Sequence, residues 1–400
     1  MGTRAPRVEK RIIFGDKGRQ NIILQAKVHL KNSAPYNSTL EQNSTPLASV
    51  LLQDFTPPAA PRLFIVLIAC LVLAAYALAG CGNSGPKIAF FVYKGNDTFI
   101  SEMMGHMEAN IPEGWSYEVR DAGNSQSVQN QQIVELIDDG FDLFVINAVD
   151  RLACSSIVEK CAKKGIPVIF FNREPLGDAL GGSSVFYVGA ATDSLGEKQA
   201  DMVAELFTAN FAGSKYDRNG DGAVQLIILK GEQGHQDAEK RTDFCVGRLK
   251  ELGYDVDVHT TEVADWNRRD GYEAMRRLYE RYGQSVELIF SNNDDMALGA
   301  IDYLLDAGVF TAGKDISDQP FVIVGVDGTV VGLEAIRNGL LYGTVNNDSV
   351  KQSDAILTLA GYIIDKKQFD DFPYTITNEH YIYIDGDIIT RENLDEYTRN

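Results

Sequence analysis

The stretch VQLIILKGEQGHQDAEKRT, residues 224–242, decides how this chain folds. It opens with an apolar segment, VQLIILKG, of the length and composition of a strand buried in a sheet. A polar loop follows. Asp237 and Arg241 then stand four residues apart, which is the spacing of neighbours on a helix. A buried strand, a polar loop and a helix in this order are typical of one unit of a parallel α/β sheet.

The same unit recurs from Lys87 onward. The strand candidates are KIAFFVY, DLFVINA, PVIFFN, VFYVGA, VQLIILKG, DVDVHT, ELIFSNND, PFVIVGVD and YGTVNND. Helical patterns such as DTFISEMMGHMEAN, SVQNQQIVELIDDG, SSIVEKCAKKG, SLGEKQADMVAELFTANF and GYEAMRRLYERYG lie between them. Buried strands alternating with helices predict parallel sheets covered on both faces. There are too many units for one small sheet, so the sequence predicts two α/β lobes.

Composition narrows the class of partner. The chain has 400 residues, 44% of them hydrophobic, and a formal net charge of -19. This composition is that of a globular protein. The negative charge argues against nucleic acid or an anionic membrane surface as the main partner, and it is compatible with neutral small molecules or cations.

The N-terminal part is expected to lie outside the fold. Residues 62–81 contain an apolar run, LFIVLIACLVLAAYALA, and end in Leu78-Ala79-Gly80-Cys81, which resembles the bacterial lipobox. This pattern predicts a cleaved lipoprotein signal with lipidation at Cys81, and an uncleaved membrane anchor is the alternative. Either way the domain beyond it is extracytoplasmic. Residues 1–61 are interpreted as an upstream extension without function. Cys154, Cys161 and Cys245 are expected to be buried thiols.

Polar side chains follow the predicted strands, at the edge where parallel sheets bind ligands. They are Asp97, Asn172, His235, Asp237, Arg241, Asn293, Asp327 and Asn347. Such groups donate and accept hydrogen bonds in several directions, as sugar hydroxyls require. Phe99 and Trp266 could supply flat apolar partners for a sugar ring.

Each of these residues also has a purely structural interpretation. Asp97 could cap a helix, and Phe99 could be a core residue. Asp237 and Arg241 could simply pair with each other, while Asn172 and Asn293 could be turn residues. Their common position at strand ends favours a binding site.

The segment DRNGDGAVQLII, residues 217–228, begins like a calcium loop. Asp217, Asn219 and Asp221 alternate and Gln225 follows, but Ile228 stands where a helix–loop–helix site requires a bidentate glutamate. Calcium prefers six or more oxygen ligands, so the last carboxylate would have to come from elsewhere. A solvated turn without metal is the alternative.

From Lys87 nearly to the C-terminus the chain resembles the galactose/glucose-binding proteins of bacterial sugar ABC transporters. The motifs that carry the resemblance are YKGNDTF, PVIFFNREP, DRNGDG, LKGEQGHQDAEKRT, SNNDDMALGAI, VGVDG and GTVNND. It implies a periplasmic-binding fold of type I, with two doubly wound parallel-sheet lobes joined by three crossover strands. The lobes would be residues 87–190 with 348–382 and residues 191–347 with 383–400.

The resemblance also implies roles for individual residues. Phe99 and Trp266 would hold the sugar ring between them, and the eight polar residues given above would bind its hydroxyls. Calcium would be held by the loop residues Asp217, Asn219, Asp221, the carbonyl of Ala223, and Gln225, with Glu287 completing the sphere. Gly95–Asn96 and Asn267 depart from the family's usual residues and could adjust the preference between sugars.

The implied function is capture of a hexose by lobe closure and delivery to an ABC transporter permease, by a monomer anchored to the membrane through its lipid. A sugar sensor that presents its closed form to a chemoreceptor or sensor kinase is the alternative. An enzyme on sugars would use paired carboxylates, and a repressor would need a basic helix-turn-helix before Lys87. We expect neither.

Overall fold

The computed structural model describes residues 85–182, 184–207 and 211–398. The predicted extension (1–61), the signal segment (62–81) and the lipidation at Cys81 lie outside these residues. Among the helices that the structure describes, none has the length and apolar content needed to span a membrane.

The first lobe is built on a parallel sheet whose described strands follow the order β11-β5-β4-β3-β1-β2. The strands are β1 (Lys87–Val92), β2 (Ser116–Asp121), β3 (Leu143–Ile146), β4 (Val168–Phe171), β5 (Val185–Ala190) and β11 (Tyr381–Ile384). The helices are α2 (Thr98–Ala109), α3 (Gln126–Leu136), α4 (Cys154–Lys164) and α10 (Ser349–Ile364), with short 3-10 turns η1 (Arg151–Ala153) and η2 (Gly177–Leu180).

The second lobe repeats this plan with the order β12-β10-β9-β8-β6-β7. The strands are β6 (Ala223–Lys230), β7 (Asp255–Val263), β8 (Leu288–Ser291), β9 (Val322–Asp327), β10 (Gly343–Asn346) and β12 (Ile388–Thr390). The helices are α5 (Thr192–Phe207), α6 (Gln236–Glu251), α7 (Arg268–Tyr282), α8 (Asp294–Asp306), α9 (Val330–Arg337) and α11 (Leu394–Tyr397), with the turn η3 (Ile316–Asp318). The β10–β12 pair is antiparallel, so this sheet is parallel except at one edge.

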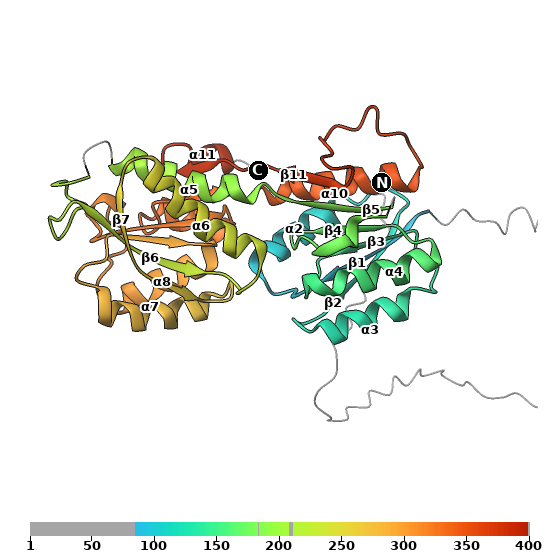
Figure 1. Cartoon of the computed structure of the whole chain (residues 1–400), viewed down its shortest axis with the longest axis horizontal. Coiled ribbons are helices and arrows are strands. Elements are labelled where there is room, and N and C mark those ends of the chain that lie inside the picture. Colours follow the sequence, from blue (N-terminus) through green and yellow to red (C-terminus); the bar gives the residue numbers. More distant parts are fainter. Residues whose placement is uncertain (1–84, 183, 208–210, 399–400) are drawn as a thin grey trace, which may run out of the picture. The chain divides into compact units, whose positions relative to one another are not determined.

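Helices cover both faces of each sheet, because neighbouring strand residues point to opposite sides. Phe90 packs in the core under α2 and α10, and Phe91 packs in the core under α3 and α4. In the second lobe Leu226 packs with residues of α5 and α6, and Ile227 packs with residues of α7, α8 and α9. Figure 1 shows the helices of each lobe around its strands. The two predicted α/β lobes are confirmed.

The described chain passes between the sheets three times: from β5 to α5, from β10 to α10, and from β11 to β12. The first two crossings lie at the predicted positions near residues 190 and 347. All of Tyr381–Ile384 pairs with β5 of the first sheet. The predicted boundary after residue 382 therefore falls inside β11, and the third crossing follows Ile384.

The three cysteines of the described chain, Cys154, Cys161 and Cys245, are buried and free, as predicted. Burial raises the pKa of each thiol, that of Cys154 and Cys161 to about 12. Since the thiolate is the reactive form, these residues are core side chains and not nucleophiles.

Candidate functional site

Asp97 lies in the loop after β1 and caps α2. Its Oδ1 accepts a hydrogen bond from the Ile100 amide at 3.0 Å, and its Oδ2 accepts one from the Tyr93 hydroxyl at 2.5 Å. The predicted helix cap therefore exists, and it fixes a carboxylate at the carboxyl edge of the first sheet. Phe99, in the first turn of α2, belongs to the core and also lines the cavity described below.

Asn172 follows β4 with a backbone φ of 59°, a conformation uncommon for residues other than glycine. Its Oδ1 accepts from Asn147 Nδ2 at 3.1 Å, and its carbonyl accepts from the Tyr187 hydroxyl at 2.9 Å and from Gln236 Nε2 at 2.8 Å. These bonds hold the strained residue in place. Backbone strain of this kind concentrates at binding sites.

The polar loop between β6 and α6, quoted at the outset, places His235 and Asp237 at the start of α6. His235 caps the helix, with its Nδ1 accepting from the Asp237 amide at 3.1 Å. Burial holds the pKa of His235 well below its usual value, and Arg173 and Arg241 lower it further. The ring is therefore neutral, and because Nδ1 accepts, the proton is assigned to Nε2, which can donate to a ligand.

Trp266 stands over this loop. Its φ is 60°, and a Cβ atom at Gly231 would lie 2.2 Å from the indole, so only glycine lets the ring approach β6 so closely. The ring meets His235 edge to face at 5.1 Å. The Trp266 carbonyl accepts a hydrogen bond from Asn293 Nδ2 at 3.3 Å. Asn293 also caps α8, because its Oδ1 accepts a hydrogen bond from the Met296 amide.

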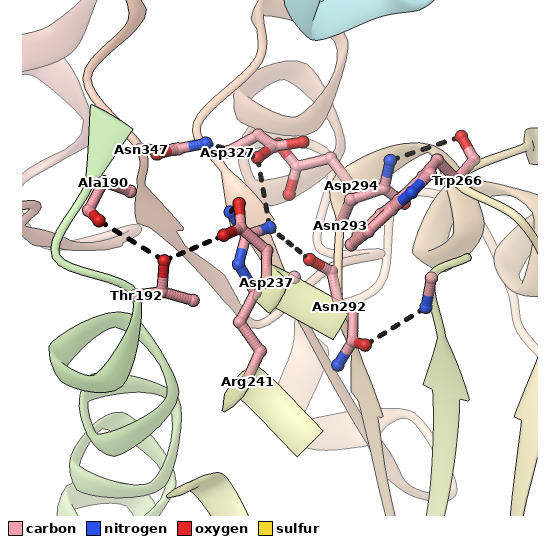
Figure 2. Close-up of polar contacts among 12 residues, drawn as sticks. Ala190, Thr192, Asp237, Arg241, Trp266, Asn292, Asn293, Asp294, Asp327 and Asn347 are labelled. Carbon is pink, nitrogen blue, oxygen red and sulfur yellow. Dashed lines mark hydrogen bonds and ion pairs between the residues drawn. The ribbon is translucent and has the colours of Figure 1, made fainter. Parts of the chain in front are cut away.

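Arg241 connects the remaining polar residues (Figure 2). Its guanidinium lies 3.1 Å from Asp237 and 3.5 Å from Asp327, and it donates to the Asn292 carbonyl at 2.6 Å. Asn347 donates to Asp327 at 3.2 Å. Burial raises the pKa of Asp327 well above its usual value, while Arg241 lowers it.

Thr192, at the first crossing between the lobes, contacts Asp237. Its hydroxyl lies 2.9 Å from Asp237 Oδ1 and 3.3 Å from the Ala190 carbonyl. Figure 2 draws both contacts as dashed lines. Asp237 is thus held on one oxygen by Arg241 and on the other by Thr192. Its remaining lone pairs can accept only from a ligand or water.

All ten residues predicted to bind sugar line a single cavity between the lobes. They are Asp97, Phe99, Asn172, His235, Asp237, Arg241, Trp266, Asn293, Asp327 and Asn347. The empty space among them, counted together with the space open to solvent, is about 340 Å³. Sequence reasoning missed three further lining residues, Tyr93, Ile100 and Arg173. Arg173 follows β4 directly after Asn172, so the strand-end rule could have found it.

The charges in the cavity nearly cancel. Asp97, Asp237 and Asp327 carry the carboxyl groups, while Arg173 and Arg241 carry the guanidinium groups. A cavity with balanced charges and several separate donors and acceptors suits an uncharged ligand with many hydroxyl groups better than an anion or a cation.

Polar contacts also link the two lobes. Thr98 donates to Asp295 at 2.6 Å, and the Val330 amide donates to Glu102 at 3.1 Å. Arg173 forms an ion pair with Glu232 at 2.6 Å. Each contact joins a residue of the first lobe to a residue of the second.

The predicted calcium loop lies beside Glu287. The Glu287 Oε1 accepts from the Arg218 amide at 2.6 Å, and its Oε2 accepts from the Gln225 amide at 3.0 Å. Gln225 Nε2 donates to Asp221, while the buried Gln225 Oε1 has no partner. Burial raises the pKa of Glu287, and Asp217 raises it further.

In the described chain no three His, Cys, Asp or Glu side chains converge as a metal-binding group. Even so, an unpaired buried amide oxygen and two carboxyl groups that repel each other are what a bound cation would relieve. The donor set of the loop and Glu287 fits a calcium ion.

Comparisons with known proteins identify the family. Residues 88–368 match the family model described as "Periplasmic binding protein domain". The chain belongs to the periplasmic binding proteins. It is 32% identical to the D-galactose/methyl-galactoside binding periplasmic protein MglB of Haemophilus influenzae, over 78% of this chain and 92% of that protein.

Other periplasmic binding proteins match over similar spans. The ribose import binding protein RbsB of Bacillus subtilis is 27% identical, covering 69% of this chain and 85% of its own. The structure of an ABC transporter solute binding protein from Bacillus halodurans, with bound myo-inositol, superposes with a TM-score of 0.64 at 25% identity, covering 79% and 98% of the two chains. The chain is therefore a binding protein of type I fold and not an enzyme, and periplasmic binding proteins are extracytoplasmic.

Proposed function

We propose that this protein captures a hexose of the glucose or galactose type outside the cytoplasm and delivers it to an ABC transporter. The observation that carries this proposal is the convergence of ten strand-end residues on one cavity with balanced charge. The relative that binds D-galactose and methyl-galactoside supports the sugar class.

Hydrogen-bond geometry supports recognition of hydroxyl groups. His235 offers a donor, Asp97 and Asp237 offer acceptors, and Arg241 offers a charged donor. A hexose that fills these positions exchanges its water for fixed partners. An analogue without one hydroxyl leaves a buried group unpaired, which is how such a site becomes selective.

The aromatic residues complete the site. Phe99 and Trp266 both line the cavity and would contact the C–H faces of the sugar ring. Closure of the lobes over the ligand then removes it from water, and contacts that exist only in the closed form determine how much closure stabilises the complex.

Binding is tested by isothermal titration of the metal-loaded protein with D-glucose, D-galactose, D-allose, D-ribose and myo-inositol. We expect the tightest binding with glucose or galactose. Tighter binding of ribose or myo-inositol would keep the transport role and overturn the hexose assignment.

We propose calcium as a structural ligand of the same lobe, held by Asp217, Asn219, Asp221, the Ala223 carbonyl, Gln225 and Glu287. The ion would tie the loop before β6 to the residue that precedes β8. Because Glu287 is buried and lies outside the cavity, its role is in stability and not in sugar contact.

We also propose that Cys81 carries a lipid that holds the protein at the membrane. In a bacterial host, Cys81→Ala should move the protein from the membrane fraction to the soluble extracytoplasmic fraction. Retention of the variant in the membrane would favour an uncleaved apolar anchor.

A further inference from the structure

Tyr93 and Arg173 line the cavity but are not among the residues proposed above to contact the sugar. Tyr93 directly follows β1, is buried, and donates a hydrogen bond from its hydroxyl to Asp97 Oδ2 at 2.5 Å. The other oxygen of Asp97 is taken by the Ile100 amide. Tyr93 therefore supplies the second of two protein hydrogen bonds that fix this carboxylate.

Arg173 holds the Tyr93 ring in place. Its guanidinium carbon lies 4.0 Å from the centre of that ring, a distance at which a cation attracts an aromatic face. One nitrogen donates to the Val149 carbonyl at 2.8 Å. The other donates to Glu232 at 2.6 Å.

Glu232 belongs to the other lobe. It lies in the loop between β6 and α6, and its side chain is 40% exposed, whereas that of Arg173 is 3% exposed. Separation of the lobes would break this ion pair and admit water to Arg173. The contact between Arg173 and Glu232 is thus a contact of the closed form.

We propose that Tyr93 is the positioning residue for Asp97, and that the Arg173–Glu232 ion pair makes this positioning depend on lobe closure. The inference rests on the proposed sugar-binding function. The ion pair with Glu232 holds Arg173, and Arg173 holds the Tyr93 ring. The Tyr93 hydroxyl in turn orients the Asp97 carboxylate inside the cavity.

This arrangement sets the polarity of the hydrogen bond to the ligand. Burial raises the pKa of Tyr93, and the Asp97 carboxylate raises it further, so the phenol keeps its proton and only donates to Asp97. The lone pairs left on Asp97 accept hydrogen bonds. The ligand group at this position must therefore be a donor, such as a hydroxyl, and an ether or carbonyl oxygen is rejected.

The first test is Tyr93→Phe, which keeps the ring and removes the hydroxyl. The matched control is Tyr272→Phe, since Tyr272 donates to the Asp306 carboxylate at 3.1 Å on an exposed face outside the cavity. By calorimetry, Tyr93→Phe should weaken binding of the preferred hexose about tenfold to 100-fold. Affinity within twofold of wild type, as expected for the control, would overturn the proposal.

The second test separates positioning from general damage to the fold. A series of monodeoxy sugars identifies the hydroxyl that Asp97 binds, as the one whose removal abolishes the effect of Asp97→Asn. Tyr93→Phe should cost affinity for every sugar that retains this hydroxyl and little for the one that lacks it. An equal loss across the whole series would indicate a structural defect and overturn positioning.

The third test is the coupling to closure. Glu232→Gln should weaken binding, and Tyr93→Phe should cost at least threefold less in the Glu232→Gln background than in the wild type. Losses that simply multiply would refute the coupling. The control Asp302→Asn removes an exposed ion pair with Arg268 inside one lobe.

A readout without sugar keeps this inference distinct from the proposed function. Small-angle scattering of the unliganded protein should show a lower closed fraction in Glu232→Gln and in Arg173→Met than in Asp302→Asn. A protein that binds no monosaccharide yet shows this shift would refute the sugar assignment. The role of the Arg173–Glu232 ion pair in lobe closure would stand. A protein that binds sugar without this shift would refute only the role of the Arg173–Glu232 ion pair in lobe closure.

Discussion

The Arg241 guanidinium lies 3.1 Å from the Asp237 carboxylate, and both side chains are almost completely buried. Asp327 is a second carboxyl partner of the same arginine, at 3.5 Å. The cation therefore holds together two acids that we propose as ligand-binding groups. Removing an acid and removing the arginine should have different consequences.

We expect Asp237→Ala to abolish most sugar affinity and preserve the fold. Arg241 keeps Asp327 as its partner, and the Thr192 hydroxyl can turn to the Ala190 carbonyl at 3.3 Å. Calorimetry should show a loss of about 100-fold or more in affinity, as for other buried charged contacts. Unchanged affinity would mean that Asp237 does not contact the sugar.

Arg241→Ala should instead destabilise the protein itself. It leaves the buried Asp237 and Asp327 without their cation, which typically costs about 3–5 kcal/mol. Urea unfolding should show this loss of unfolding free energy. The control is Arg268→Ala, which removes an exposed ion pair with Asp302 and should cost less than about 1 kcal/mol. Equal effects of the two variants would contradict the buried network.

Trp266 can be followed by its own fluorescence. The chain has two tryptophans, and Trp115 packs against the core of the first lobe away from the cavity. Sugar should change the emission of the wild type and of Trp115→Phe, but not that of Trp266→Phe, which keeps an aromatic ring for the sugar. Trp266→Ala should in addition weaken binding about tenfold or more. A signal that persists in Trp266→Phe would place the ligand elsewhere.

Metal removal should affect stability more than affinity. Chelation of calcium should lower the melting temperature by on the order of 5 °C, given a tightly bound ion. Glu287→Gln should lower it similarly and make chelator ineffective. Glu262→Gln, at an exposed ion pair with Arg277, is the control. A melting temperature indifferent to chelator would refute the calcium site.

Asp294 should give the protein a pH-dependent stability. It is completely buried behind Asn293 and accepts from the hydroxyls of Thr344 and Thr329 at 2.6 and 2.9 Å. Burial raises its pKa to about 7 from an ordinary value of 3.8. Because the folded protein favours the protonated form, its contribution is fully present below about pH 4 and is lost as the pH rises to 7.

The measurement is the difference in unfolding free energy between Asp294→Asn and wild type. This difference should increase in favour of the variant between pH 4 and 7, by up to about 4 kcal/mol. It should then stay constant at higher pH. A difference that does not vary with pH would show that Asp294 is ionised in both states.

The sequence predicted the strands that are buried on both faces and, through them, which residues would converge. Parallel strands all end at one edge, so the residues after them were expected to converge, and the ten residues from Asp97 to Asn347 do line one cavity. Strand ends are a property of chain order and apolar patterning, which a sequence displays directly.

The sequence predicted less where burial is partial or contacts are distant. β2 is half-exposed and reads SYEVRD, so it shows no continuous apolar run. β11 and β12 have only 4 and 3 residues, which is too short to stand out in the sequence. Tyr93 looked like the last residue of an apolar strand. Its bond to Asp97 and the pair of Arg173 with Glu232 depend on tertiary packing that no local pattern encodes.

The most direct test of the account is an isothermal titration of the purified, calcium-loaded protein with D-glucose and D-galactose, run beside Asp237→Ala. We predict saturable binding of at least one of the two hexoses by the wild type, and its loss in the variant. Absence of any heat of binding with these and other monosaccharides would contradict the claim that the cavity between the lobes is a sugar site.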